Sequence, residues 1–431
     1  MPFNKDILVP IRVIRDPVHG NISIYPLEEE IIASKPFQRL RFISQLSLCS
    51  FVYPGAVHNR FSHSIGTMHL AGEMYTHLVS NTPNEIFDPE LFQIVRLTAL
   101  LHDIGHGPFS HVFERAVIFF GKKIKNIQEF HHENMSVKII DELLNNILPN
   151  NSRQLIISLL EKKSVPSEQF FLSQIISSEF DADRADFLLR DSYFSGVSYG
   201  KYELSRLLDT MFLVNHPGSN NEKIITFKDK GLMALENFLF ARYNMYRGVY
   251  YHHTNLIGDA MVTRGLYELF KRDLYPLRAI TDPKEFIKWN DTRIFGLFQE
   301  IIYNKSIYIK NSNPNISSIS GLLFRNLWKR VSITKGDPDA IYKNISDHLS
   351  KLGHDIDFII EKITVKKIPY THLPYSSVKD SGAIYIYNIK ENKVQELSEV
   401  MKIQVPENFI FSKLLLVHPD YQKIVQKLVN Q

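Results

Sequence analysis

The 431-residue sequence contains a single cysteine and no long apolar run. With Cys49 alone, a disulfide framework and a metal site built on thiolates are both excluded. Any bound metal must therefore use histidine and carboxylate ligands. No run of about 18 apolar residues occurs, and the N-terminal segment MPFNKDILVP lacks the pattern of a signal peptide. We therefore expect a cytoplasmic protein that is neither exported nor membrane-spanning.

Low-complexity segments and a strong charge bias are also absent. Hydrophobic residues make up 44% of the chain and charged residues 22%, and both values are ordinary for a folded protein. The formal net charge of +4 is small for this length, so it argues only weakly for an anionic ligand and does not require nucleic acid. We expect the whole chain to fold, as one large domain or two.

Turn residues and apolar periodicity predict a mainly all-α fold. Residues 11–26 alternate between apolar and polar around an Asp-Pro and a His-Gly, which predicts a short N-terminal β-hairpin. Apolar residues then recur at helical spacing up to about residue 260. The helices predicted in this way cover residues 90–101, 134–148, 152–160, 172–193 and 231–247.

The C-terminal part has a different character. Helices are expected to continue to residue 358, and short strands are predicted at 363–370, 382–388 and 411–419. These elements indicate a small mixed α/β lobe. We place a soft boundary between a core at residues 1–264 and a C-terminal region at 265–431, because no linker composition marks a sharper one.

Histidine is the residue that the sequence has in excess. Nine of the 17 histidines fall between His58 and His132. The segment HDIGHGPFSH at 102–111 combines three histidines, an aspartate, two glycines and a proline, a composition with no packing rationale. The predicted helix ends there, so the backbone is free to aim the neighbours His102 and Asp103 at one ion. The glycines make that geometry accessible.

Two further residues complete a candidate metal site. His63 lies in NRFSHSIG and Asp183 lies in FDADRADFLLRD, so four ligands would come from three elements. A divalent metal on such ligands suits the hydrolysis of a phosphate ester, and the ligand types accept Mg, Mn, Fe, Ni or Zn. Asp186 and Arg190, four residues apart, are interpreted as an ion pair on the helix surface.

Other residues near this site are candidates for proton transfer. His106 and His111 follow the His-Asp pair, and His132 begins another predicted helix. Histidine titrates near neutral pH, so each of these rings could give a proton to a leaving oxygen. Glu133 is a candidate for orienting one of the rings, whereas His131 is interpreted as a solvated neighbour.

Several motifs, taken together, carry a family resemblance. In chain order they are DPVHG, FQRLRFISQL, HNRFSHSIG, LLHDIGHGPFSH, HHE and FDADRADFLLRD. This combination closely resembles the HD-domain deoxynucleoside triphosphate triphosphohydrolases, in the branch related to the sterile-alpha-motif HD-domain protein. The similarity covers residues 10–260. It implies a helical HD core, a homo-oligomer, and hydrolysis of a deoxynucleoside triphosphate by water that attacks the α-phosphorus.

The resemblance also implies a role for individual residues. The implied metal ligands are His63, His102, Asp103 and Asp183, and the implied proton-transfer residues around the α-phosphate are His106, His111 and His132. The residues implied to bind substrate are Arg60, Arg184 and Arg242 at the phosphates, Gln45 and Leu46 beside the sugar, Asp191 at the 3′-hydroxyl, and Tyr250 against the 2′ carbon. Crowding by Tyr250 would exclude ribonucleotides.

The sequence departs from the family pattern in places. Ala33 stands where activated relatives carry an acidic residue that reads guanine, which argues against activation by GTP, although Gln38, Arg39 and Arg41 are kept at a potential activator site. Tyr251 replaces the glutamine that follows the sugar-stacking tyrosine, so base selectivity is expected to differ. We also expect no N-terminal sterile-alpha-motif domain.

Two alternative functions stay open. HD domains also hydrolyse nucleoside monophosphates, cyclic nucleotides and guanosine polyphosphates, although three arginines favour a polyphosphate. A nucleic-acid-binding regulatory protein is the second alternative, supported only by the basic segment GKKIKN at 121–126 and a pI near 8.7. The oligomer could be a dimer, tetramer or hexamer.

Overall fold

The residues that alternate around Asp-Pro and His-Gly form the predicted β-hairpin. In the computed structural model, β1 (Arg12–Asp16) pairs antiparallel with β2 (Gly20–Ile24), and Asp16 lies opposite Gly20. The Asp16 carboxylate accepts hydrogen bonds from the backbone N–H groups of Val18 and His19, both at 2.9 Å. Gly20 has a φ of +76°, a left-handed conformation that favours glycine at the turn.

The structure describes residues 8–123, 130–163, 165–216, 222–304, 314–333, 336–362, 383–401 and 414–430. The strand predicted at 363–370 lies outside these ranges. The last three residues of the basic segment GKKIKN, at 124–126, lie outside them too. Neither prediction is tested.

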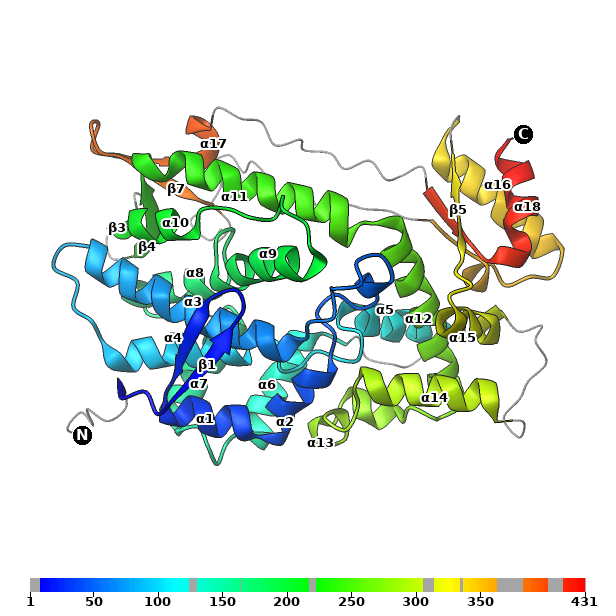
Figure 1. Cartoon of the computed structure of the whole chain (residues 1–431), viewed down its shortest axis with the longest axis horizontal. Coiled ribbons are helices and arrows are strands. Elements are labelled where there is room, and N and C mark those ends of the chain that lie inside the picture. Colours follow the sequence, from blue (N-terminus) through cyan, green and yellow to red (C-terminus); the bar gives the residue numbers. More distant parts are fainter. Residues whose placement is uncertain are drawn as a thin grey trace.

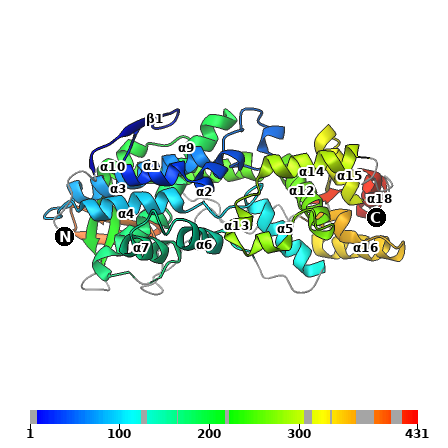
Figure 2. The same cartoon turned by 90° about the horizontal axis from the view of Figure 1, so that it is seen from below.

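The core is mainly helical, as predicted, and α3 packs against α4 and α9 within it (Figure 1). Figure 2 shows the hairpin on one side of α3 and α4, with α6 and α7 on the other. The helices of this part are α1 (Pro26–Ala33), α2 (Lys35–Gln38), α3 (Arg60–Asn81), α4 (Pro89–Leu101), α5 (His111–Lys123), α6 (His132–Leu143), α7 (Asn150–Leu160), α8 (Phe170–Ile176), α9 (Ala182–Ser195), α10 (Leu204–Thr210), α11 (Leu232–Met245) and α12 (His253–Lys271).

The predicted helix over residues 172–193 is interrupted. The chain forms α8 and α9 instead, because Ser177 takes an extended conformation and ends α8. Asp181 then caps α9, and its side chain accepts a hydrogen bond from the backbone N–H of Arg184 at 2.7 Å. The prediction of one continuous helix was wrong, and the interruption places Asp183 in the first turn of α9.

The core also contains a β-sheet that sequence patterns did not predict. Its strand order is β3 (Met211–Asn215), β4 (Lys223–Lys228), β7 (Tyr385–Asn388) and β8 (Lys393–Glu396), and β4 and β7 run parallel. The strand predicted at 382–388 is therefore confirmed as β7, but it joins the core and does not belong to the C-terminal lobe. The pairing connects segments that lie 159 residues apart.

A small mixed α/β lobe ends the chain, as predicted, at the opposite end of the molecule from β3 (Figure 1). Its strands are β5 (Lys329–Ser332), β9 (Leu414–Val417) and β6 (Ile360–Lys362), in that order in the sheet. The remaining helices are α13 (Pro283–Phe286), α14 (Asp291–Tyr303), α15 (Pro314–Phe324), α16 (Pro338–Lys351), α17 (Leu397–Val400) and α18 (Gln422–Val429).

The lobe has a hydrophobic cluster of its own, which includes Val331, Leu349 and Val425. The boundary expected after residue 264 falls within α12, and side chains on both sides of it share the main core. Among the described residues, no helix combines the length and the apolarity needed to cross a bilayer.

A buried ion pair attaches the hairpin and α1 to α4. Arg96 donates two hydrogen bonds to Glu28, at 2.6 and 2.9 Å, and a third to the Ser23 carbonyl at 2.9 Å. Glu28 also accepts from the backbone N–H of Tyr25 at 3.1 Å. Both charged side chains are almost completely buried, so the loss of either partner leaves the other charge without compensation.

We expect Glu28→Gln to lower the free energy of unfolding by about 3 kcal/mol, because the Arg96 charge stays buried without its partner. Urea-induced unfolding measures the change. Glu29→Gln is the matched control, since its partner Arg12 lies at 3.1 Å with 66% of its side chain exposed. The control should cost less than about 1 kcal/mol, and equal losses in the two variants would contradict the prediction.

Candidate functional site

The four predicted metal ligands lie together where three helices meet. His63 is in the first turn of α3, His102 follows α4, and Asp183 is in the first turn of α9. The ligand atoms of these three residues all lie within 4.8 Å of one another. Asp103 is adjacent, with one carboxylate oxygen 3.3 Å from Nε2 of His102 and the other 3.6 Å from Nε2 of His63.

Both imidazoles direct their Nε2 atom at this cluster. Nδ1 of His102 donates to the Ala99 carbonyl at 2.7 Å, and Nδ1 of His63 donates to Asp186 at 2.7 Å. The two Nε2 atoms are buried and make no hydrogen bond, although that of His63 lies 3.0 Å from Asp183. Two orphaned imidazole nitrogens facing carboxylates fit a divalent cation, which would satisfy all of them.

The electrostatics of the cluster also favour a positive charge. Burial lowers the pKa of His63, but the carboxylates of Asp183 and Asp186 outweigh it and raise this pKa to about 10. Burial likewise raises the pKa of Asp183, yet the neighbouring rings of His102 and His63 hold it well below its usual range. The residues therefore attract a proton where a metal ion would lie.

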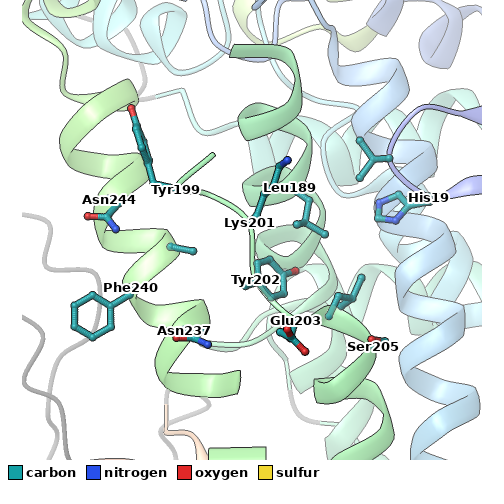
Figure 3. Close-up of a pocket in the computed structure, with 13 residues that line it drawn as sticks. His19, Leu189, Tyr199, Lys201, Tyr202, Glu203, Ser205, Asn237, Phe240 and Asn244 are labelled. Carbon is teal, nitrogen blue, oxygen red and sulfur yellow. The ribbon is translucent and has the colours of Figure 1, made fainter. Parts of the chain in front are cut away.

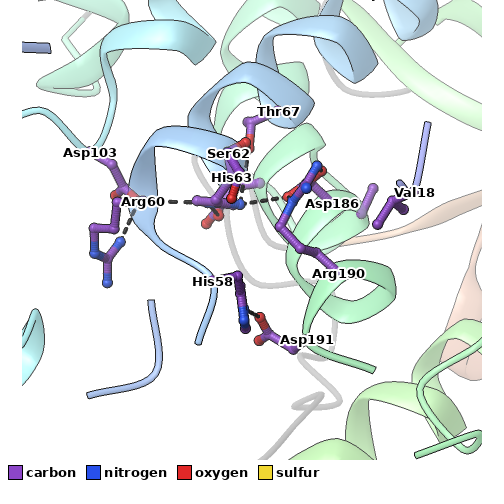
Figure 4. Close-up of polar contacts among 12 residues, drawn as sticks. Val18, His58, Arg60, Ser62, His63, Thr67, Asp103, Asp186, Arg190 and Asp191 are labelled. Atoms are coloured by element: carbon purple, nitrogen blue, oxygen red, sulfur yellow. Dashed lines mark hydrogen bonds and ion pairs between the residues drawn. The ribbon is translucent and has the colours of Figure 1, made fainter. Parts of the chain in front are cut away.

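Asp186 and Arg190 are fully buried, so their interpretation as a surface ion pair was wrong. Arg190 donates two hydrogen bonds of 2.8 Å to Asp186 and another of 2.8 Å to Asp16 of the hairpin. Asp186 lies 2.7 Å from Nδ1 of His63 (Figure 4). It also lies 2.7 Å from Nε2 of His19. Asp186 thus fixes the orientation of a predicted metal ligand, as carboxylates behind the ligands do in metalloproteins.

The sequence spacing of Asp186 from Asp183 could have indicated that Asp186 lies near the predicted metal site. Asp183 and Asp186 are three residues apart, so both lie on the face of α9 that meets α3. Gly66, three residues after His63 on α3, leaves room for the contact, because a Cβ atom there would collide with Asp186 and Arg190. Asp186 and Arg190 are buried because they lie on the face of α9 that packs against α3, and their four-residue spacing alone does not reveal this.

A second cluster lies next to the first. Nδ1 of His132 is 2.6 Å from one oxygen of Glu114, and Nδ1 of His111 is 3.5 Å from the other. Burial raises the pKa of Glu114, but the two histidines hold it well below its usual range.

Glu133 is 59% exposed and its oxygen is 3.6 Å from the same nitrogen of His132, so its geometry does not support an orienting role. Sequence reasoning missed Glu114, although it follows His111 by one helical turn. His131 is exposed, in agreement with its interpretation.

His106 differs from the two other histidines of this cluster. It is buried, and its ring stacks on His132 at 3.8 Å. Burial and the charge of Arg60 hold the pKa of His106 well below its usual range. A neutral, buried ring is a poor proton donor, whereas His111 has 66% of its side chain exposed. His111 is therefore the most exposed of the three rings.

The glycines of the HDIGHG segment serve packing, which was not the reason we expected. Neither Gly105 nor Gly107 has a positive φ; the left-handed residues are Phe109 and Ser110. A Cβ on Gly105 would collide with the backbone of α6, and one on Gly107 would collide with Phe113. Close approach of α6, not backbone freedom, requires glycine at residue 105.

Most of the predicted substrate residues border one cavity of about 310 Å³. They are Gln45, Leu46, Arg60, Asp191 and Tyr250. The same cavity is bordered by His111, Arg115, Tyr251 and Asp259. Tyr250 ends a π-helical turn at Tyr246–Tyr250 that follows α11, and its hydroxyl donates to Asp191 at 2.7 Å.

Arg184 and Arg242 do not border this cavity. Arg184 contacts Asp181, and Arg242 contacts Glu179, so both lie beside the segment that leads to Asp183. Arg60 contacts Asp103 and donates to the Ser110 hydroxyl at 2.7 Å. The structure therefore brings Arg60 to both the cavity and the metal ligands.

Arg39, which we expected at an activator site, has a structural role. It is buried and donates to the carbonyls of Trp289 at 2.8 Å, Ile104 at 3.2 Å and His106. It therefore supports the HDIGHG segment from behind. Arg41 stays at the surface, where its guanidinium lies 3.5 Å from the ring centre of Phe61.

A larger cavity of about 780 Å³ lies elsewhere (Figure 3). His19 borders one side of it, and Asn237, Phe240 and Asn244 of α11 border the other. It contains none of the predicted site residues and neither histidine cluster. The smaller cavity is therefore the candidate active site, because the predicted site residues border it although the other cavity is larger.

The chain is similar to proteins with HD domains. Residues 60–191 match the HD domain family, and residues 204–356 match the HD associated region. The chain is 33% identical over 414 residues to the uncharacterized protein YwfO of Bacillus subtilis. The aligned region covers 90% of this chain and 87% of that protein. It spans 64% of the length of another relative, from Methanocaldococcus jannaschii.

Two further similarities concern activity and fold. The chain is 29% identical over 416 residues to a Dictyostelium discoideum protein named deoxynucleoside triphosphate triphosphohydrolase SAMHD1 homolog, covering 93% of this chain and 76% of that protein. The crystal structure of a phosphohydrolase from Bacteroides thetaiotaomicron superposes with a TM-score of 0.73 at 26% identity, covering 94% of this chain and 99% of that one.

We expect Asp183→Ala to lose most of its bound metal while it keeps its fold, because one ligand disappears and 35% of this side chain is already exposed. Elemental analysis of the purified protein and circular dichroism measure the two properties. Asp209→Ala is the matched control, since the Asp209 side chain is 63% exposed and its carboxylate lies 3.8 Å from His77, outside the metal-ligand cluster. Full metal content in Asp183→Ala would remove this residue from the site.

Asp186→Asn tests the buried support of His63. The amide keeps the size of the side chain but weakens its hold on the imidazole, so metal affinity should fall roughly 10- to 100-fold. Competition with a chelator measures the affinity. Asp259→Asn, which alters an ion pair with Arg115 outside the cluster, should bind metal as the wild type does. Unchanged affinity in Asp186→Asn contradicts the assigned role.

Proposed function

This chain belongs to the HD-domain family and carries the HD-associated region, and we propose that it hydrolyses deoxynucleoside triphosphates to the deoxynucleoside and inorganic triphosphate. The observation that carries the proposal is the position of Arg60. Its side chain borders the 310 Å³ cavity and contacts Asp103 beside the metal ligands. A nucleotide in the cavity would therefore place its phosphates next to the metal site. The name of the Dictyostelium relative supports the same substrate class.

Three arginines are proposed to bind the phosphates. Arg60 borders the cavity, whereas Arg184 of α9 and Arg242 of α11 contact Asp181 and Glu179 in the segment before α9. Each is paired with a carboxylate in the structure, but a guanidinium has five N–H donors and can bind a phosphate oxygen in addition. Their distribution between the cavity and the segment that leads to Asp183 suits a chain of phosphates better than a single one.

His63, His102, Asp103 and Asp183 are proposed to hold a divalent metal ion. When bound, the ion supplies charge neutralisation for the phosphoryl oxygens and acidifies the attacking water. The role of the chain is to direct two Nε2 atoms at the ion, and the Ala99 carbonyl and the Asp186 carboxylate hold the rings in this orientation by accepting from Nδ1. The ligand set does not select among Mg, Mn, Fe, Ni and Zn.

His111 is proposed as the proton donor. Attack of water on the α-phosphorus breaks the bond to the 5′ oxygen, which takes a proton as the deoxynucleoside leaves. His111 borders the cavity and is largely exposed, while Glu114 lies 3.5 Å behind its ring. His132 is hydrogen-bonded to the other oxygen of Glu114. The neutral ring of His106 stacks on His132.

The sugar is proposed to lie between Tyr250 and Asp191, near Gln45 and Leu46. Burial raises the pKa of Tyr250 well above its usual range, so the hydroxyl stays protonated and donates to Asp191. This bond fixes the ring, which would crowd a 2′-hydroxyl. The carboxylate of Asp191 would accept a hydrogen bond from the 3′-hydroxyl.

Product analysis tests the proposed reaction. We expect the purified protein, incubated with each deoxynucleotide and Mg²⁺ or Mn²⁺, to release inorganic triphosphate and the deoxynucleoside, and Asp183→Ala to release neither. Ion-exchange chromatography separates the products. Release of monophosphate or pyrophosphate would replace the proposal with another HD-type reaction, and tight oligonucleotide binding without turnover would favour a regulatory protein.

A further inference from the structure

A buried histidine outside the metal and proton-transfer clusters contacts the substrate cavity indirectly. His58 precedes α3, and its imidazole is completely buried. The ring stacks on Phe194 with a centroid distance of 4.7 Å and an interplanar angle of 15°. Its Nε2 lies 2.8 Å from Oδ1 of Asp191 (Figure 4). His58 itself does not border the cavity, whereas Asp191 does.

The protonation of this ring follows from its neighbours. A carboxylate accepts hydrogen bonds, so Nε2 of His58 carries the proton that it donates to Asp191. Nδ1 is buried and makes no hydrogen bond. In a neutral ring, Nδ1 is then an unpaired acceptor, which buried sites tolerate better than an unpaired N–H. Stacking on Phe194 and one directed hydrogen bond hold the ring in place.

Asp191 therefore has its orientation set before any ligand arrives. Oδ1 accepts from His58 and Oδ2 accepts from Tyr250 at 2.7 Å. Only 1% of Asp191 is exposed, so a ligand reaches its carboxylate only from within the cavity. An ionised carboxylate has about four lone-pair positions, and two are occupied here. The remaining positions can accept a hydrogen bond from a hydroxyl group of a bound sugar.

We propose that His58 is a positioning residue that makes this protein selective for nucleotides with a 3′-hydroxyl, because it holds Asp191 in the orientation that accepts that group. The inference rests on the proposed function, in which Asp191 binds the sugar. It assigns the selectivity to the pair formed by His58 and Asp191 and not to Asp191 alone. Loss of the Nε2–H donor would leave Asp191 held by Tyr250 only.

The test compares two substitutions that differ in which imidazole nitrogen they imitate. The amide nitrogen of His58→Gln can reach the place of Nε2, whereas that of His58→Asn can reach only the place of Nδ1. We measure kcat/KM for a deoxynucleoside triphosphate and for its 2′,3′-dideoxy analogue. The wild type should prefer the 3′-hydroxyl roughly 10- to 100-fold, as expected for a hydrogen bond to a charged group.

The glutamine variant should keep most of this preference, and the asparagine variant should lose at least about fivefold of it. A residue needed only for the fold would lower both rates in parallel and leave the ratio unchanged. An unchanged ratio in His58→Asn therefore overturns the inference. Phe194→Leu gives a second measurement if the asparagine variant does not fold: the ratio should fall because the ring loses its stacking partner, and an unchanged ratio overturns the inference as well.

The wild type separates this failure from failure of the proposed function. Absence of triphosphate release in the wild type would overturn the reaction itself. Release of triphosphate at equal rates from both substrates would remove Asp191 from sugar binding, and the inference with it. A wild type that discriminates, beside a His58→Asn variant that discriminates equally, would leave the reaction intact and reject His58 alone.

Discussion

The hydrogen bond from His63 to Asp186 is the interaction on which the rest of the site depends. Burying a carboxylate without compensation is costly, and here Arg190 and His19 supply the compensation. Arg190 in turn contacts Asp16 of the hairpin. The hairpin, α3 and α9 must therefore all be in place before the imidazole of His63 is oriented. The orientation of this proposed metal ligand thus depends on the tertiary structure and not on its own motif alone.

The histidines of the site occupy different environments within a few ångströms. His63 is buried and His102 is partly buried, and each has one nitrogen anchored and the other directed at carboxylates, which suits a cation. His111 is exposed toward the cavity and is backed by Glu114, which suits exchange of a proton with a substrate. Asp103 lies between the two groups, 3.3 Å from His102 and 3.2 Å from His106. Burial and hydrogen-bond partners, rather than residue type, distinguish the histidines proposed to bind metal from the one proposed to transfer a proton.

Local chemistry made part of this structure predictable. The hairpin around residues 16–20, the end of α4 at residue 101 and the convergence of His63, His102 and Asp183 all follow from turn residues and motif spacing. The burial of Asp186 and the use of Glu114 depend on which helix faces meet, which periodicity does not determine. The interruption between α8 and α9 escaped prediction because an N-cap at Asp181 outweighed continuous apolar periodicity. Pairing of β4 with β7 involves residues too distant in sequence for any local pattern.

That parallel pairing has a consequence for synthesis of the protein on the ribosome. The partner of β4 is made 159 residues later, after the whole HD core and most of α12 to α16 have emerged. Until then β4, an apolar strand that is mostly buried in the finished protein, has an open edge on one side. Such edges pair readily with other chains. Translation speed between residues 228 and 385 and the availability of chaperones should therefore influence the yield of folded protein.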